Sequence, residues 1–479
     1  MAYNHGVKVS EVPTSILPPV RTSAGITFVV GTAPVFMTDI NNVNKPILCH
    51  TREDAVKAFG YVEPKNGMYE YTLCEVMDTH FKYKNVAPVI FACVPSFTTG
   101  ERQEISLDEG TTSDSGATYT VDGYFVECEV TAPGIYDEPL DIAGIEYVDG
   151  KTIISMSSQT CLSRDEVHVY GKVITPAEVS STDIIGGVDA QGNKTGLELV
   201  NECFPRFRLV PGIIIAPGYS GNSAVAAVIA AKAAKINEHF SCIGIVDIPT
   251  DTVKQYSKAA EWKNTNNITD ERLVCCWPKL SLGGVQFHQS SQLAALMAEV
   301  DAENDDVPYV SPSNKNYAMD SAVLEDGTEV WLSPDTAAYL NSQGIVTALN
   351  FMDGWKCWGN RTAKYPGGTD VKDTFIPIRR MFSWIGNTLI QTYWQKVDAP
   401  LNRRQIDTIV DSANMWLNGL TAREYILGGR VEFLETENPT TDLMDGIARF
   451  HVYITPPSPN REIDFILEYD PQYVETLFA

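Results

Sequence analysis

Residues 448–469 read ARFHVYIT, PPSPNR and EIDFILEY in succession. Apolar and polar side chains alternate in the first and third pieces, which predicts two β-strands, Ala448 to Thr455 and Glu462 to Tyr469. The proline-rich piece between them is stiff and extended, so it suits a spacer better than a hairpin turn. We therefore expect the second strand to be given to a neighbouring subunit, with the tail Tyr473 to Phe478 as the alternative donor.

Two amphipathic helices and a short strand, Arg430 to Glu435, come before this stretch. Pro377 lies in the first turn of helix one, where its missing N–H costs no hydrogen bond. In helix two we expect Asn402 as the N-cap, Gln405 three residues on, and Gly419 as the end. The expected apolar positions are Ile378, Met381, Phe382, Ile385, Leu389 and Tyr393 in helix one, and Ile406, Ile409, Val410, Ala413, Trp416 and Leu417 in helix two. The other face of helix two carries Arg403, Arg404, Asp407 and Asp411, which indicates either a docking surface or a solvated face.

A second extended segment lies at the other end of the sequence. Residues 1–25 contain a short alternating piece followed by Pro13, Pro18 and Pro19. These prolines exclude a helix and cannot donate to a strand ladder, so the segment is expected to run extended over a surface. Two tethered strands at opposite ends of the sequence suggest strand exchange between subunits.

Between the two ends the sequence predicts an α/β domain, residues 26–95 and 186–370, because apolar strands alternate with amphipathic helices. Residues 96–185 are rich in Thr, Ser, Gly and Asp and predict an inserted all-β domain. Asp-Gly pairs at 122–123 and 149–150 predict hairpins there. Residues 301–370 read as loops. The predicted fold class is therefore multidomain, α/β plus α+β, with a C-terminal helix-pair and strand domain at 371–461 and a strand and linking arm at 462–479.

Composition limits the possible functions. The 479 residues carry a net charge of −25, which disfavours nucleic acid and anionic membranes as partners. No apolar run approaches the roughly 18 residues of a membrane span, and the N-terminal residues lack the apolar core of a signal peptide, so we expect synthesis in a cytoplasm. The ten cysteines have no zinc-ligand spacing and are expected to be buried reduced thiols.

Three stretches partly match the patterns of known chemical sites, and none of them predicts catalysis. Gly218-Tyr219-Ser220-Gly221-Asn222 lies where a hydrolase nucleophile would lie but lacks the second glycine of that motif, so a helix-capping turn is the better interpretation. Residues 186–196, GGVDAQGNKTG, are one residue out of register with a phosphate-binding loop. The acidic residues Asp301, Glu303, Asp305 and Asp306 lack the pattern of a calcium loop and are expected to form a solvated turn. We expect no catalytic, metal or cofactor site.

Seven further stretches, taken in order, carry a family resemblance. They are HGVKVSEVP, IIGGVDAQGNKTGLELV leading to PGIIIAPGYS, RLVCCWPKL, YVSPSNK, LNSQGIVTALNFMDGWKCWGNRTA, FIPIRRMFSWIGN through VDAPLNRRQI, and ITPPSPNREIDFILEYDPQYVETLF. In these stretches the chain resembles the contractile tail sheath proteins of bacteriophages and of phage-tail-like bacteriocins. The resemblance spans the chain except residues 96–185.

The resemblance implies a mechanical function. Sheath subunits stack as six-membered rings around an inner tube and collapse into a shorter, wider helix that drives the tube through a bacterial envelope. Their terminal arms each add a strand to a neighbour, their C-terminal domain faces the tube, and their variable insertions face outward. The implied partners are the chain itself, the inner tail tube protein, and baseplate and tail terminator proteins, with no nucleic acid and no direct membrane insertion. The implied location is the virion tail or a tail-like particle made in a bacterial host.

Carried over to this sequence, the resemblance implies three sets of interface residues. The arm strands are Val7, Lys8, Val9, Val12, Ile463, Phe465 and Leu467; the acceptor strand is Phe450, Val452 and Ile454; the tube-facing residues are Arg403, Arg404, Asp407 and Asp411. Two other functions remain as alternatives, an α/β hydrolase-like enzyme that uses Ser220 and a non-contractile capsid or baseplate protein.

Overall fold

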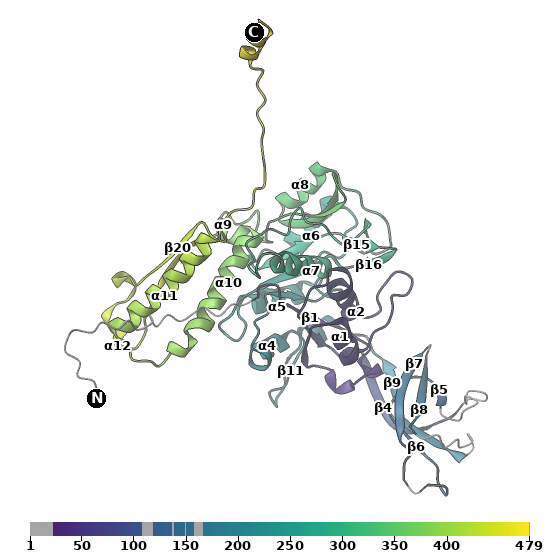
Figure 1. Ribbon diagram of the computed structural model, residues 1–479. Coiled ribbons are helices and arrows are strands. Elements are labelled where there is room, and N and C mark those ends of the chain that lie inside the picture. The colour runs from purple at the N-terminus through teal and green to yellow at the C-terminus, as the bar shows by residue number, and fades with distance from the viewer. Residues whose placement is uncertain (1–22, 108–117, 137, 149, 158–165, 479) are drawn as a thin grey trace, which may run out of the picture.

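The computed structural model describes residues 23–107, 118–136, 138–148, 150–157 and 166–478. An eight-stranded sheet lies at its centre, with a β-rich segment at one end and a helix pair with two strands at the other (Figure 1). The predicted mixed α/β fold class is confirmed at this level.

The central sheet has the strand order β19-β18-β14-β13-β12-β1-β3-β2. Its strands are β1 (Thr27–Gly31), β2 (Pro46–Cys49), β3 (Val89–Cys93), β12 (Ile213–Ile215), β13 (Ile243–Asp247), β14 (Leu273–Cys276), β18 (Ile345–Asn350) and β19 (Trp355–Trp358). The inner strands pair in parallel, and β2 and β19 pair antiparallel at the two edges. Such a sheet must be covered on both faces, which explains the continuous apolar strands.

Two apolar cores cover the two faces. On one face Val29, Phe91 and Ile245 pack with residues of α2 (Thr72–Met77) and α7 (Gln289–Ala302). On the other face strand residues pack with α4 (Val200–Phe207), α5 (Ser223–Ala234), α6 (Tyr256–Thr265) and α8 (Pro334–Ser342). This part also contains α1 (Arg52–Phe59), α3 (Ser181–Ile185), a π-helical turn (Asp78–Tyr83) that continues α2, and short 3-10 helices.

The β-rich segment contains two three-stranded antiparallel sheets. Their orders are β4-β9-β6 and β5-β8-β7, with β4 (Phe97–Ile105), β5 (Thr118–Asp122), β6 (Phe125–Thr131), β7 (Ile142–Val148), β8 (Lys151–Met156) and β9 (His168–Pro176). The pair β7–β8 forms the hairpin predicted around residue 150. The hairpin predicted at Asp122-Gly123 is wrong, because β5 pairs with β8 and the chain then crosses into the other sheet as β6.

Residues 301–370 are not simply loops, so that prediction is wrong. They contain β17 (Ser321–Val323), α8, and the pair β18–β19 that completes one edge of the central sheet. Strand β17 pairs with β15 (Lys279–Leu282), which also pairs with β16 (Val285–Phe287). The apolar run at 345–349 is short, and its burial comes from the distant strand β14, which sequence patterning does not reveal.

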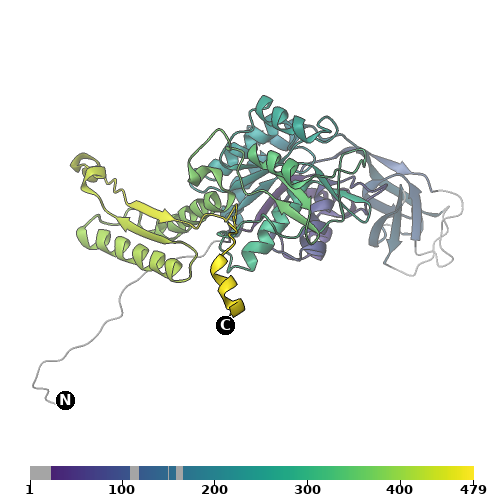
Figure 2. The same cartoon turned by 90° about the horizontal axis from the view of Figure 1, so that it is seen from above.

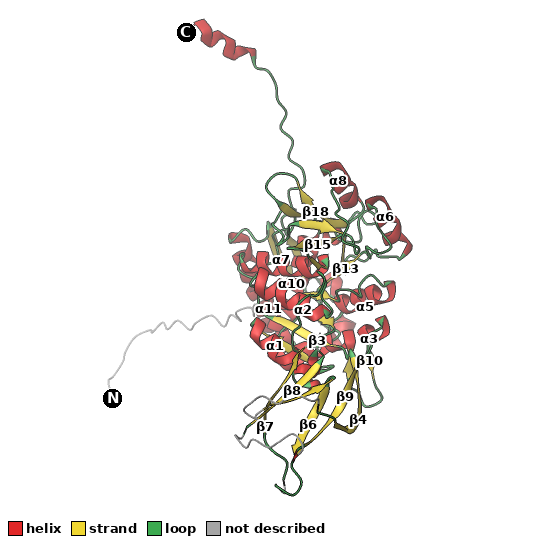
Figure 3. Ribbon diagram, turned by 90° about the vertical axis from the view of Figure 1, so that its right-hand side faces the viewer, coloured by secondary structure: helices red, strands yellow, loops and turns green. Residues whose placement is uncertain are grey.

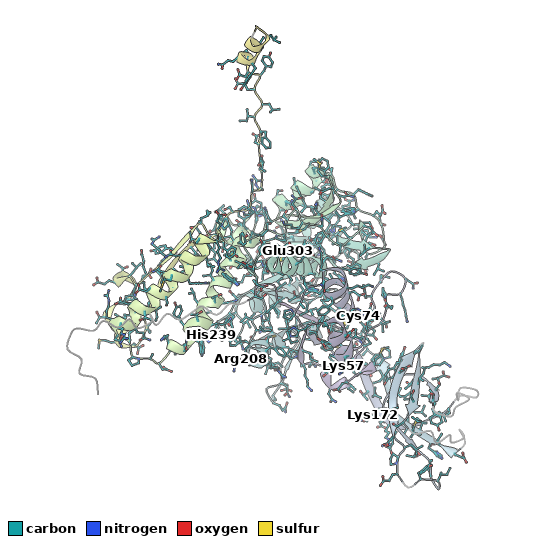
Figure 4. The ribbon with its side chains drawn as sticks, viewed as in Figure 1. Lys57, Cys74, Lys172, Arg208, His239 and Glu303 are labelled. Atoms are coloured by element: carbon teal, nitrogen blue, oxygen red, sulfur yellow. The ribbon has the colours of Figure 1, made fainter. Side chains whose placement is uncertain are left out.

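The C-terminal unit consists of α10 (Ile376–Tyr393), α11 (Arg403–Ala422), β20 (Gly428–Glu432), α12 (Thr440–Met444) and β21 (His451–Thr455). It stands beside the central sheet, opposite the β-rich segment (Figure 2). Helix α10 is joined to the central part through Asn387, which hydrogen-bonds both backbone groups of Ser241 at 3.0 and 2.8 Å. His239, labelled in Figure 4, adds an edge-on ring contact with Trp394 at 5.0 Å.

One prediction for the C-terminal unit needs correction. Asn402 caps α11 by accepting from the Gln405 N–H at 3.0 Å, as predicted, but the helix passes through Gly419 and ends at Ala422. The helix continues because Leu420 is buried in the core of the unit, and this packing outweighs the weak helix propensity of glycine. Glu462 to Tyr469, the strand expected to be given to a neighbour, has no strand partner within the single chain, and the prediction stays a prediction. Those residues run extended away from the molecule to a short 3-10 helix, η8 (Pro471–Phe478) (Figure 3).

Candidate assembly interface

The strands β20 and β21 form a two-stranded antiparallel sheet in which Val431 lies opposite Val452. The outer edge of β20 is already occupied at its centre by a side chain of α11. The Asn414 amide donates to the Val431 carbonyl at 3.0 Å, and its oxygen accepts from the Val431 N–H at 2.8 Å. Asn414 therefore takes the place that a further strand would take beside β20.

The outer edge of β21 differs. Because the backbone groups of Val431 point to Asn414, the Val431–Val452 pair is a non-hydrogen-bonded pair of the ladder. By the same alternation the N–H and C=O groups of Val452 and Ile454 point outward, away from β20. Among the described residues nothing pairs with this edge. Two of the three residues named as acceptor positions from the sequence, Val452 and Ile454, thus present free backbone groups in the part of the chain that the structure describes, and Phe450 directly precedes the strand.

The side chains of the same three residues face inward. Phe450, Val452 and Ile454 pack, partly buried, against a core that includes Met381, Trp384, Leu417 and Val431. The opposite face carries polar and aromatic groups, with Arg430 lying 3.9 Å from the ring centre of Tyr453. An added strand would therefore gain ladder hydrogen bonds from the edge and apolar contacts from one face only.

The predicted C-terminal donor segment is exposed. Ile463, Phe465 and Leu467 are 66%, 81% and 94% exposed, and Ile466 on the alternate side is 89% exposed. Such a run of exposed apolar side chains costs free energy in water, and exposed apolar runs of this kind are typical of interaction sites. The N-terminal positions Val7, Lys8, Val9 and Val12 lie outside the described residues.

The root of the N-terminal segment is fixed by a buried ion pair. Arg380 of α10 donates to both carboxylate oxygens of Asp301, at 3.0 Å for Oδ1, and to the Ala24 carbonyl at 3.0 Å. The side chains of Arg380 and Asp301 are 3% and 1% exposed. The solvated turn predicted for the acidic residues is confirmed for Glu303, Asp305 and Asp306, which are exposed in a turn. It is wrong for Asp301, which lies buried on the last turn of α7 against Arg380 of α10. Arg380 thus joins three segments of the chain.

The charged face of α11 lies in solvent. Arg403 pairs with Asp407 one turn on, with Nε–Oδ1 at 2.9 Å and side-chain exposures of 87% and 50%. Arg404 and Asp411 are also exposed. The four positions share an accessible helix face, which is a requirement for the predicted tube contact.

Ser220 does not have the surroundings of a nucleophile. Its hydroxyl is buried, donates to the Asp247 carboxylate at 3.2 Å and accepts from the Asp247 N–H at 3.0 Å. The nearby His288 is hydrogen-bonded through Nδ1 to Glu75 at 2.8 Å, and no histidine among the described residues bonds Ser220. Burial lowers the pKa of His288, but the Glu75 carboxylate outweighs it, so the net pKa is raised. The turn instead leads into Asn222, which caps α5 as predicted.

Other features bear on the remaining alternatives. The described cysteines are free thiols, and all except the half-buried Cys128 are buried. Where the structure describes the chain, no three His, Cys, Asp or Glu side chains come together to hold a metal ion. No described helix is long and apolar enough to span a bilayer.

Two features of the candidate interface were not predicted from the sequence. One is Asn414. In the sequence it is only a polar residue next to the apolar stripe of α11, and nothing there indicates that it bonds β20. The other is an apolar groove of about 750 Å³ between α10, α11 and β21. Its walls come from residues 389 to 452, and no single periodic pattern in the sequence links them.

Comparison with known proteins gives consistent results. No family model matches the chain. The tail sheath protein of Burkholderia phage BcepMu is 24% identical over an alignment of 489 residues that covers 99% of this chain and 98% of that protein. The tail sheath protein of Escherichia phage P2 is 24% identical over 306 residues, which cover 62% of this chain and 72% of that protein.

Solved structures share the fold. The helical sheath of the anti-feeding prophage in its contracted state has a TM-score of 0.59 at 13% identity, covering 98% of this chain and all of that one. The contracted PVC sheath complex, an extracellular contractile injection system, has a TM-score of 0.57 at 12% identity, with 99% of both chains covered. Sequence similarity along the whole chain and the shared fold together make this chain a homologue of phage tail sheath proteins.

Proposed function

We propose that the chain is the structural subunit of a contractile sheath, and that copies are linked by adding a terminal strand of one subunit to the β21 edge of another. The observation that carries this proposal is the presence, in one chain, of a strand edge that no described residue pairs with and of an exposed apolar segment with strand alternation. In an isolated subunit the edge lacks hydrogen-bond partners and the segment exposes apolar side chains to water. In a second copy the segment can pair with the edge, which removes both costs.

The domain roles follow from the same proposal. Residues 1–25 and 462–479 are linking arms, residues 26–95 and 186–370 form the α/β domain, residues 96–185 form an outward-facing insertion, and residues 371–461 face the inner tube. The subunit is made in a bacterial cytoplasm and becomes part of a tail or tail-like particle that includes tube, baseplate and tail terminator proteins. Its role is structural, because contraction can draw on free energy stored when two packings of one sequence differ.

Negative-stain electron microscopy of the purified chain, with and without its tube protein, tests this function. We expect polymers with a regular striation, extended and narrow around the tube and shorter and wider without it. Closed shells or plates of fixed size would instead support the capsid or baseplate alternative. A chain that stays monomeric at every concentration would contradict the sheath proposal.

The exposed face of α11 gives a second test, of the tube contact. Replacing both Arg403 and Arg404 by Glu should lower the fraction of tube-filled sheaths at least tenfold, which corresponds to about 1.4 kcal/mol, because it reverses the charge of the surface proposed to meet the tube. Empty-sheath formation should be unchanged. Arg423→Glu, at the C-terminal end of α11 and outside the proposed contact, is the control for a reversed charge elsewhere on the unit. Loss of both filled and empty sheaths would show a folding or lattice defect instead.

A further inference from the structure

The C-terminal unit has an open groove at the end where β21 begins. Its walls are the last turn of α10, the loop at 396–401, the first half of α11 and the residues 445–452 that lead into β21. Most of the lining is apolar, and Val397 and Leu401 at the rim are 64% and 39% exposed. At about 750 Å³ the groove is large enough for several side chains.

The same chain carries an apolar ridge that fits such a groove. In the 3-10 helix η8, Val474 and Leu477 are three residues apart, so their side chains lie one above the other. They are 41% and 79% exposed. The helix stands clear of the rest of the molecule at the end of the extended segment (Figures 1 and 3).

The segment after β21, residues 456–478, leaves its own subunit in the direction away from this groove. It follows Thr455, at the far end of β21, and Pro457 to Arg461 then lie beside Tyr309, Trp358 and Arg361 of the central part. The loops that form the groove are at the α12 end of the unit, whereas the tail rises from the other end (Figure 1). The ridge is therefore placed to reach a second copy.

We propose that η8 of one subunit docks in the groove of the neighbour that receives its strand. The docking proposal rests on the proposed strand addition to the β21 edge. It also specifies the direction in which the added strand runs. Only Asp470 separates the predicted strand end, Tyr469, from the start of η8 at Pro471. If the added strand runs antiparallel to β21, it ends where β21 begins, which is where the groove lies. If it runs parallel, η8 arrives near Thr455 instead. The occupied groove thus requires the antiparallel orientation.

The docked helix would act as a second anchor beyond the strand. The strand holds the neighbour by backbone hydrogen bonds along an edge, while Val474 and Leu477 fill a preformed apolar space. Two attachments on one tail strengthen each other, because the first raises the effective concentration of the second. A tail held at two points would stay attached while subunits change their relative orientation.

Chemical cross-linking between copies tests the orientation. Leu477→Cys and Val397→Cys are placed in one chain, both at exposed sites, and polymers are treated with a short bismaleimide. We expect dimers and longer ladders on a denaturing gel, above the background of the parent chain with its native cysteines. The pair Leu477→Cys with Thr455→Cys is the matched control and should give no ladder. A ladder from the control pair alone would overturn the proposal in favour of parallel addition, and a link formed within monomers would overturn it in favour of folding back.

Assembly measurements separate this proposal from strand addition itself. Val474→Asp with Leu477→Asp should raise the critical concentration for polymerisation about tenfold or more, because two apolar side chains lose their burial. Gln472→Asp on the same helix should leave it unchanged. An unchanged critical concentration in the double variant, with normal polymers, would overturn docking while leaving strand addition intact. A cross-link from Val9→Cys to Val397→Cys in place of the Leu477 link would assign the groove to the N-terminal arm and would also overturn the proposal.

Discussion

Replacing Phe465 by Asp should give a folded monomer that no longer polymerises. Phe465 is 81% exposed in the single chain, so its loss removes no internal contact and the free energy of unfolding should not change. In the proposed lattice the side chain is buried against the neighbour's Phe450 and Val452, where a full aromatic burial contributes about 1.5–3 kcal/mol. Placing a charge there adds a desolvation cost. Sedimentation velocity should find only monomer at concentrations about 100-fold above the critical concentration of the parent chain.

Ile466→Asp is the matched control for this experiment. Ile466 is 89% exposed and also apolar, but strand alternation places it on the opposite side from Phe465. We expect Ile466→Asp to polymerise with only a small shift in critical concentration. If both variants polymerise like the parent chain, the segment is not a donated strand. If both fail equally, the segment docks in some other conformation.

Replacing Arg380 by Met should cause a large loss of stability in the C-terminal unit. The variant leaves the Asp301 carboxylate buried without its cation and the Ala24 carbonyl without its donor. Removing one partner of a buried pair costs about 3–5 kcal/mol. Denaturant unfolding followed by circular dichroism measures the change. Because Arg380 holds the root of the N-terminal segment, we also expect earlier proteolysis near residue 24.

Two further variants make the measurement specific. Asp301→Leu combined with Arg380→Met replaces the pair by apolar groups and should recover a large part of the loss, since no unpaired charge remains. Arg403→Ala breaks an exposed pair, which contributes about 0.3–0.5 kcal/mol at most. A loss from Arg380→Met no larger than that from Arg403→Ala would show that the buried pair does not hold the segments together.

Local patterns in the sequence were sufficient for several parts of this structure. The apolar stripe and the Asn402 cap predicted α11, and alternation predicted β20 and β21, because these elements depend on neighbours three or four residues away or on period two. The resemblance to sheath proteins, carried by motifs along the chain, is confirmed by relatives and by fold. Period-two alternation also predicted a donated strand at Glu462 to Tyr469, which is extended and has no strand partner among the described residues, so that prediction stays open.

The sequence by itself determined the mixed α/β fold class, the helix pair, the two strands of the C-terminal sheet and the sheath homology, since each depends on local periodicity or on ordered motifs. Only the tertiary structure decided that Asp301 is buried against Arg380, that Asn414 occupies the outer edge of β20, and that no described residue covers the β21 edge or its groove. The reason is physical. Edges and grooves are made by residues far apart in the chain, and which backbone groups remain free depends on how those residues meet in space.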